Sequence, residues 1–275
     1  QQAISDQART EFDQYVQSLR NHDITVHVIE DTPEPHTPDS LFPNNWISIH
    51  PDGTMVTYAM LVENRRQERR TDILSFFRSE YNITRHLDLS RHELEHRFLE
   101  GTGSIIFDYV KQKAYACLSP RTDKVLFQKL CKLLNYESFF FHACDKKGIP
   151  IYHTNVMMFI GHKNAVLCLE AIQDLEEKKN LTTQLKNSGH ETIDISLEQM
   201  AHFCGNILEV TNKAGDTFLA MSEQAYRAFT LKQIRTLEQN TSIIHTPLDT
   251  IETIGGGGAR CMLTGIHLPP ISNRT

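Results

Sequence analysis

One local pattern, a β-hairpin followed by a helix and then a strand, recurs along the sequence and limits the folds that it can adopt. Residues 103–119 predict such a hairpin, residues 121–134 a helix and residues 136–144 a strand. The same order is predicted for residues 151–196 and again for residues 204–246. A spacing of roughly 45–60 residues is typical of radial arrays, in which each unit packs against its neighbours. We therefore expect a closed ring of ββαβ units around a central channel.

The N-terminal part of this array is incomplete. Residues 4–20 carry apolar side chains at helical spacing and residues 24–30 alternate like a strand, but no strand precedes the helix. A hairpin at residues 46–60, a helix at 65–80 and a short strand at 85–90 follow. The chain begins in a helical pattern without a methionine, which is typical of a trimmed N-terminus. We predict one α/β domain over all 275 residues, with a first module that lacks its opening strand.

Composition excludes several classes of partner. The net charge is −6 and no Lys/Arg tract occurs, so the sequence is unlike that of a nucleic-acid-binding protein. No apolar run approaches the roughly 20 residues that cross a bilayer, so no membrane is expected as a partner. The six cysteines form no C-x-x-C pair, which argues against a disulfide scaffold or a zinc site. These features predict a cytoplasmic protein with reduced thiols, and they are compatible with a homodimer.

Four glycines precede a single cysteine, Cys261, in the C-terminal stretch "IGGGGARCM". Glycine permits positive φ and close backbone approach, so this run can form a tight turn that presents the thiol to a ligand. A helical turn after the glycines would favour the thiolate through its N-terminal dipole. The stretch is not a phosphate loop, because no Lys-Ser/Thr pair follows it. A nucleophile and a flexible loop beside a buried cysteine are both compatible with this pattern.

Two further residues are candidate partners for a cysteine nucleophile. His153 in "IYHTNVMM" precedes an apolar strand and lies between polar neighbours, which suits a general base. Glu100 in "FLEGTGSIIF" precedes two glycines and a strand. Taken alone, His153 could equally be a hydrogen-bonded histidine at a strand end, and Glu100 could equally be a solvated loop acid. Together they occupy corresponding ends of repeated strands, which favours convergence on one channel.

These motifs resemble those of the pentein, or amidinotransferase-like, superfamily. "GGGGARCM" resembles its C-terminal Gly-rich Cys motif, "FLEGTGS" its Glu-Gly-Gly motif and "YHTN" its His-x-Asp motif. "LFPNNW", which contains Phe42, resembles its Phe-x-x-Asp motif, and "ENRRQER" resembles the arginine-rich segment that follows. The motifs are in family order from residue 41 to residue 262. The resemblance is strongest to citrulline hydrolases related to arginine deiminase, and it implies a five-bladed α/β propeller of ββαβ modules.

The resemblance also implies roles for individual residues. Cys261 would be the nucleophile, His153 the general acid/base, and Glu100 the partner that orients imidazole and substrate. The two aspartates with which the family binds a guanidinium group fall on Asn45 and Asn155. No metal and no organic cofactor is implied, and the expected partner is a small amino-acid substrate.

The two asparagines change the chemistry that this site can recognise. A guanidinium only donates hydrogen bonds and suits carboxylates, whereas a neutral ureido group offers one oxygen acceptor and nitrogen donors. An asparagine amide has both a donor and an acceptor end, so Asn45 and Asn155 match a ureido group. The sequence therefore predicts a hydrolase of L-citrulline that releases ornithine, ammonia and carbon dioxide through a covalent thioester-type intermediate. Arginine or a modified arginine is the alternative substrate.

Other interpretations concern the remaining motifs. Arg65 or Arg66 could bind the substrate carboxylate, although both equally fit a solvated helix. "HELEH" at residues 92–96 formally matches a zinc-protease motif, but Ser90 and Glu93 also fit a capping box. A non-catalytic binding protein with the pentein fold is the remaining alternative, and the presence of the candidate nucleophile and its partners argues against it.

Overall fold

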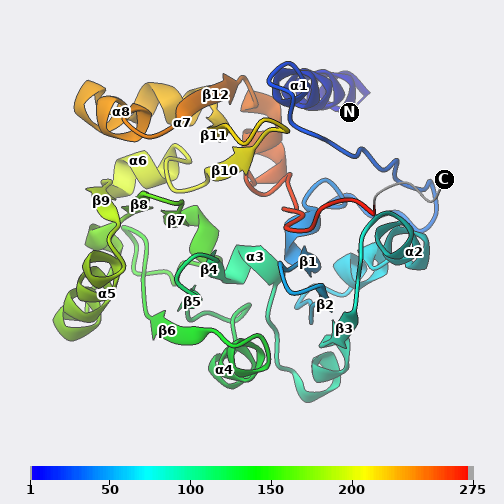
Figure 1. Cartoon of the computed structure of the whole chain (residues 1–275), viewed down its shortest axis with the longest axis horizontal. Helices are drawn as coiled ribbons and strands as arrows, with labels where there is room; N and C mark the ends of the chain where they lie inside the picture. The colour runs from blue at the N-terminus through cyan, green and yellow to red at the C-terminus, as the bar shows by residue number, and fades with distance from the viewer. Residues whose placement is uncertain (1, 272–275) are drawn as a thin grey trace.

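The computed structural model describes residues 2–271 and contains four sheets of three strands each. In every sheet the first two strands are antiparallel, and the third lies parallel to the second after a helical crossover. Figure 1 shows the four sheets arranged around the short helix α3. The strands are β1 (Ile47–Ile49), β2 (Thr54–Thr57), β3 (Arg85–Asp88), β4 (Ile106–Asp108), β5 (Lys113–Cys117), β6 (Glu137–Phe141), β7 (Met158–Ile160), β8 (Asn164–Leu167), β9 (Glu191–Asp194), β10 (Leu208–Thr211), β11 (Thr217–Ser222) and β12 (Ser242–Thr246).

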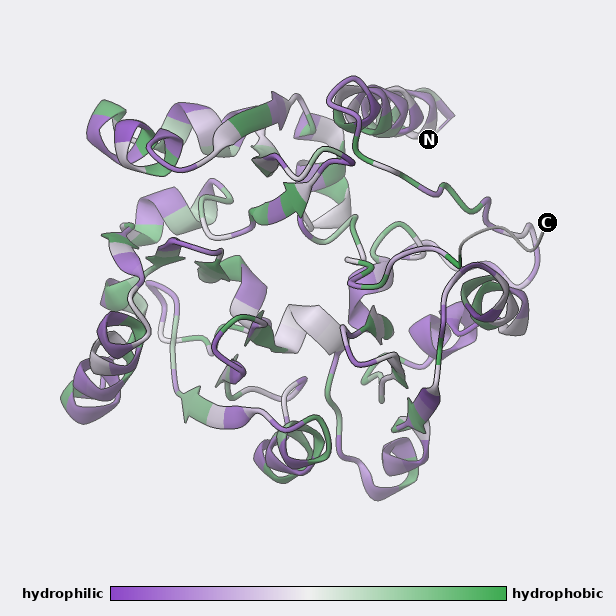
Figure 2. Cartoon of the chain, viewed as in Figure 1, coloured by the Kyte–Doolittle hydropathy of each residue, from purple (hydrophilic) through white to green (hydrophobic). Residues whose placement is uncertain are grey.

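The helices lie on the outer sides of these sheets, except for the central α3 (Figure 1). They are α1 (Gln2–Arg20), α2 (Thr71–Glu80), α3 (Gly101–Ser104), α4 (Lys124–Leu133), α5 (Leu175–Asn187), α6 (Leu197–Ala201), α7 (Glu223–Ala228) and α8 (Leu231–Glu238). Figure 2 shows hydrophilic residues on the outward faces of the peripheral helices and hydrophobic residues concentrated in the strands. Within residues 2–271, none of the helices combines the length and hydrophobicity that a membrane span requires.

The described part of the chain also contains five short 3₁₀ turns. They are η1 (Pro43–Asn45), η2 (Asn64–Glu68), η3 (Ser90–Glu95), η4 (Thr154–Val156) and η5 (Leu169–Ala171). Of these, η1 and η4 lead into the first strand of a sheet, and in both a single residue separates the turn from the strand. Each turn therefore buries an asparagine side chain at the inner end of its sheet, where a longer strand would point alternate side chains to opposite faces.

Two predicted helices are each divided in the structure. Residues 222–239 form α7 and α8, because the backbone is extended at Phe229 and the Thr230 side chain begins a new capping box with Gln233. Residues 65–80 form η2 and α2, separated by the non-helical backbone of Arg69 and Arg70. Apolar spacing alone does not distinguish one amphipathic helix from two in sequence.

The N-terminal module has its helix but no sheet within the described residues. Residues 24–30, predicted as a strand, are not in a β-ladder. They face residues 262–268 across a cavity of about 1110 Å³, which α1 also lines. In each of the four complete modules, the largely buried second strand lies between the first and the third strand. Residues 24–30 thus alternate like a strand in sequence but have no β-partner among the described residues.

Helix α1 is fixed to the segment that leads to Cys261. The buried Glu11 carboxylate accepts hydrogen bonds from the backbone N–H groups of Thr250 and Ile251, at 3.0 Å for its closer oxygen in each case. The Tyr15 hydroxyl donates to the carbonyl of Ala259 at 3.3 Å. These contacts join the first helix of the chain to the start of η6 (Ile251–Gly255) and to the glycine-rich turn.

Candidate active site

The glycine run forms a tight turn that packs against an aromatic ring. Gly256 has a φ of 71°, in the left-handed region that favours glycine. A Cβ atom on Gly257 would lie 2.7 Å from the ring of Phe42, so only glycine allows this approach. The Phe42 ring is itself buried and supports the turn. The glycines are required both for the turn and for its contact with "FPNNW".

Cys261 lies in the turn that follows, with its backbone N–H bonded to the carbonyl of Gly258 at 3.0 Å. Residues 262–271 contain no helix, so the helix dipole considered from the sequence does not act on this thiol. The sulfur instead accepts hydrogen bonds from two side-chain amides. Asn155 Nδ2 lies 3.3 Å and Asn206 Nδ2 lies 3.1 Å from Sγ. Two donors directed at a largely buried sulfur suit a thiolate.

Asn206 is a site residue that the sequence reasoning missed. Its Oδ1 accepts the backbone N–H of Arg260 at 3.2 Å, which directs its Nδ2 towards Cys261 and the carbonyl of Asn155. A Cβ on the neighbouring Gly205 would lie 2.4 Å from the carbonyl oxygen of Val156. In the stretch "CGN", the glycine allows close approach to another backbone segment and the asparagine contacts the sulfur. An asparagine also lies in "FPNNW" and in "YHTN", and this shared residue is the signal that could have identified Asn206.

His153 and Glu100 form a buried pair. Glu100 Oε2 lies 2.7 Å from His153 Nε2 and accepts a bond from Arg121 Nη1 at 3.1 Å, while Oε1 accepts the Leu61 N–H at 2.9 Å. Burial opposes ionisation of Glu100, but these bonds outweigh it and lower its pKa to about 2. Burial lowers the pKa of His153 as well, against the opposing effect of Glu100. At neutral pH the pair is therefore a carboxylate and a neutral imidazole whose Nε2–H donates to Glu100.

This arrangement leaves the other imidazole nitrogen, Nδ1, on the side of Gly103 in α3. Two contacts flank His153 and join its segment to the glycine-rich turn and to Cys261. The Tyr152 hydroxyl donates to the carbonyl of Gly256 at 3.2 Å, and Asn155 bonds the sulfur of Cys261. Within residues 2–271, no hydrogen bond joins the thiol directly to the imidazole. Imidazole and sulfur therefore belong to one site without a direct bond.

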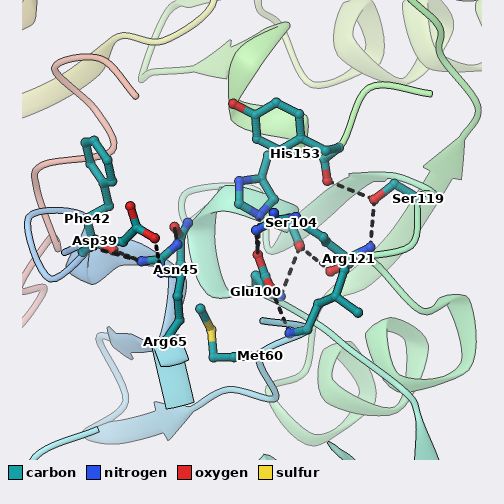
Figure 3. Close-up of polar contacts among 12 residues, drawn as sticks. Asp39, Phe42, Asn45, Met60, Arg65, Glu100, Ser104, Ser119, Arg121 and His153 are labelled. Atoms are coloured by element: carbon teal, nitrogen blue, oxygen red, sulfur yellow. Dashed lines mark hydrogen bonds and ion pairs between the residues drawn. The ribbon is translucent and has the colours of Figure 1, made fainter. Parts of the chain in front are cut away.

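Asn45 approaches the same space from the opposite side. A Cβ on Gly103 would lie 2.4 Å from Asn45 Nδ2 and 2.9 Å from His153 Nδ1, so both nitrogens border the space above this glycine. Asn45 Oδ1 accepts a hydrogen bond from Arg65 Nη1 at 2.7 Å. Figure 3 shows Asn45 and Arg65 on one side of this space and His153, Glu100 and Arg121 on the other.

Several buried polar atoms at the site have no hydrogen-bond partner in the described part of the chain. They include Asn45 Nδ2, a donor, and Asn155 Oδ1, an acceptor, besides both amide atoms of Asn44 and Nε of Arg260. Buried polar atoms are nearly always paired, so unpaired ones at a site indicate groups that a ligand satisfies. Asn45 and Asn155 thus present one donor and one acceptor beside a thiol and an imidazole.

The predicted arginines differ in what they contact. Arg65 is buried and bonds both oxygens of Glu68, at 2.8 and 2.9 Å, besides Asn45. Arg66 donates to the carbonyls of Met60 and Leu61. Arg121, which was not singled out from the sequence, has 27% of its side chain exposed and bonds only Glu100 through its side chain among the residues described. Arg121 therefore retains guanidinium donors for an incoming anion.

The zinc-protease motif is not supported by the local structure. Residues 90–95 form the 3₁₀ turn η3, and His96 adopts the left-handed conformation, so His92 and His96 do not share an α-helical face. No group of three His, Cys, Asp or Glu residues suited to a metal occurs within residues 2–271. The predicted capping box is also wrong: η3 has no side-chain cap, and Glu93 instead binds Arg69 and the Met60 N–H.

The ββαβ modules and the Cys, His, Glu and Asn residues at their inner ends define a class, the pentein (amidinotransferase-like) superfamily of arginine-modifying hydrolases. Within that class, residues 1–268 match the model for eukaryotic N,N dimethylarginine dimethylhydrolase. The chain belongs to this family. None of the curated protein sequences matches it significantly.

Solved structures confirm the fold. The N-terminal domain of ArgZ, an arginine dihydrolase from the ornithine-ammonia cycle in Cyanobacteria, has a TM-score of 0.74 and 16% identity, covering 96% of this chain and 89% of that one. Unliganded AgrE has a TM-score of 0.74 and 19% identity, covering 98% of this chain but 36% of that one. A dimethylarginine dimethylaminohydrolase adduct has a TM-score of 0.66 and 15% identity, covering 94% and 90% respectively.

Proposed function

We propose that this protein hydrolyses the ureido group of L-citrulline. The observation that supports this most directly is the unpaired donor of Asn45 and the unpaired acceptor of Asn155 in one buried site. A ureido oxygen accepts from the first and a ureido nitrogen donates to the second, so both buried atoms are satisfied by one neutral group. A guanidinium would instead place N–H groups against Asn45 Nδ2, because it has no acceptor.

The reaction begins with the thiolate of Cys261, which Asn155 and Asn206 stabilise by hydrogen bonds. The sulfur attacks the ureido carbon, and negative charge develops on the ureido oxygen beside Asn45 Nδ2. A preorganised donor at such an oxygen typically lowers the activation barrier by about 2.7–4 kcal/mol. His153 Nδ1 takes up the proton that the Cys261 thiol loses when substrate binds, and the resulting imidazolium, which Glu100 stabilises, then protonates the departing δ-nitrogen, so that ornithine leaves.

The remaining S-carbamoyl cysteine is then hydrolysed. His153 Nδ1 accepts a proton from water, which attacks the thioester carbon, and Cys261 leaves as thiolate. The released carbamate decomposes to ammonia and carbon dioxide, so the products balance citrulline plus water. Cys261 forms and breaks the bonds to the ureido carbon, and His153 carries out the proton transfers. The carboxylate of Glu100 keeps the imidazole of His153 in one tautomer.

Arg121 is the better candidate for binding the substrate carboxylate. Its guanidinium is partly exposed next to Glu100, whereas the donors of Arg65 are directed at Glu68, Asn45 and the carbonyl of Phe42. Arg66 remains a second candidate, because 27% of its side chain is exposed. A bidentate contact with a carboxylate suits arginine at this position.

Arginine is the second candidate substrate. The family description names dimethylarginine, and two of the similar structures are of an arginine dihydrolase and of AgrE bound to L-arginine. Initial rates of ammonia and ornithine release, measured side by side with citrulline, arginine, agmatine and dimethylarginine, test the proposal. We expect citrulline to have the highest kcat/KM. A higher kcat/KM with arginine would refute the ureido assignment.

A second measurement tests whether the site is catalytic at all. Iodoacetamide, a neutral reagent with a carbonyl oxygen, should label Cys261 and abolish turnover, and the Cys261→Ser variant should not be labelled at this position. Failure of the unmodified protein to react would favour a binding protein that shares the fold.

A further inference from the structure

A buried ion pair lies behind Asn45, on the side away from the imidazole. Arg65 and Glu68 are 5% and 3% exposed, and they contact each other through two hydrogen bonds of 2.8 and 2.9 Å. Arg65 Nη2 also donates to the carbonyl of Phe42 at 3.1 Å, and its Nη1 donates to Asn45 Oδ1 at 2.7 Å. The pair therefore holds a guanidinium in one place and directs one donor at the amide.

The direction of that contact determines what Asn45 can offer to a substrate. A guanidinium has five donors and no acceptor, so the Asn45 amide has to present its oxygen to Arg65. Its Nδ2 is then the atom left at the space above Gly103, where it has no partner within residues 2–271. Rotating the amide by a half-turn would set two donors against each other. The rotated Asn45 amide would lose its hydrogen bond to the charged guanidinium, which lowers the population of the rotated state by about 10- to 150-fold.

We propose that Arg65 and Glu68 act as a specificity-determining pair, which fixes the Asn45 amide so that the site recognises an oxygen acceptor and rejects a donor-only group. This inference rests on the proposed function, since it assigns the origin of the preference for a ureido over a guanidinium substrate. Neither residue is assigned contact with substrate: Arg65 acts through Asn45, and Glu68 acts by holding Arg65. Both are positioning residues.

The double variant Arg65→Met plus Glu68→Met tests the proposal, because removing both partners leaves no unpaired buried charge. The Asn45 amide can then rotate, so its oxygen can face the substrate. We expect kcat/KM for citrulline to fall about 10- to 100-fold, as expected when a hydrogen bond to the developing charge is lost. We expect the ratio of citrulline to arginine kcat/KM to fall at least as much, because arginine gains an acceptor.

The control uses the same double change in an Asn45→Ala background. With no amide to orient, removing the ion pair should leave the citrulline-to-arginine ratio unchanged from that of Asn45→Ala alone. A purely structural role would lower both rates together in either background. Arg65→Gln plus Glu68→Gln provides a second route if the double methionine variant does not fold, since two glutamines leave no buried charge, keep hydrogen bonds and no longer fix the amide.

The outcomes separate this inference from the proposed function. If the unmodified protein prefers arginine, the proposed function fails. If it prefers citrulline and the folded double methionine variant, or the folded double glutamine variant, keeps the same preference, the orienting role of the pair is wrong. A loss of preference that depends on the Asn45 amide supports the inference.

Discussion

Exchanging Asn45 for aspartate changes a single atom at the point where the proposed substrate oxygen lies. In Asn45→Asp one carboxylate oxygen keeps the contact with Arg65 Nη1, at 2.7 Å in the parent structure. The other oxygen replaces the unpaired Nδ2, so a donor becomes an acceptor. The carboxylate remains ionised because the guanidinium of Arg65 is adjacent.

The size of the effect follows from that replacement. Losing one donor to a developing oxyanion costs about 2.7–4 kcal/mol, which corresponds to about 10²–10³ in kcat for citrulline. A guanidinium substrate gains a charge-assisted contact, for which about 1.5–3 kcal/mol is typical. Because Arg65 already neutralises part of the charge, we expect the low end, a gain of about tenfold with arginine. The ratio of the two kcat/KM values should therefore change by about 10³–10⁴.

The assay measures initial rates of ornithine release with both substrates at neutral pH. Thermal unfolding and the alkylation rate of Cys261 are measured in parallel, because a misfolded variant would lose activity with both substrates and alter the thiol. If Asn45→Asp keeps kcat/KM for citrulline within about threefold of the parent value, Asn45 Nδ2 does not bind the reacting oxygen, and the reasoning is refuted.

Three further changes have defined outcomes. Asn206→Ala should slow iodoacetamide alkylation of Cys261 about 10- to 100-fold, because a donor 3.1 Å from the sulfur is lost; an unchanged rate would remove Asn206 from the site. Gly103→Ala should lower activity at least tenfold, because its Cβ would fall 2.9 Å from His153 Nδ1; full activity would show that this space is not used. Burial raises the pKa of Glu252 from 4.5 to about 7, so the folded state binds more protons than the unfolded state, and the free energy of unfolding should fall as pH rises from 4.5 to 7. Glu252→Gln should remove up to about 3 kcal/mol of this pH dependence in denaturant titrations, and equal slopes would contradict the assignment.

The sequence predicted most strands and helices because each module repeats the same hydrophobic periodicity. The prediction failed where contacts with residues distant in sequence determine the local structure. The alternating pattern at residues 24–30 predicts a strand, but without an adjacent strand the segment forms no ladder. Ser90 and Glu93 match a capping box, but Glu93 instead binds Arg69 and a backbone N–H. Local patterns cannot reveal such competing partners.

Part of the candidate site was predictable because several of its residues lie in short local motifs. Cys261, His153 and Asn155 lie in short motifs whose residue types state their chemistry, and the structure brings all three together. Asn206 contacts the sulfur, but its role depends on the backbone N–H of Arg260, which only the folded chain places beside it. Arg65 carries charge in a pattern typical of a solvated helix, and nothing in that pattern indicates that its guanidinium is buried.

The bonds from α1 to residues 250, 251 and 259, which lead to Cys261, have a consequence for biosynthesis. Glu11 and Tyr15 contact residues 239 to 244 positions further along the chain, so these bonds form only after residues 250–259 have been made. Contacts at such long range form late and slowly. A polypeptide still emerging from the ribosome would thus lack the support that α1 gives to the turn around Cys261. The surroundings of this thiol would be completed only when α1 packs against the glycine-rich segment.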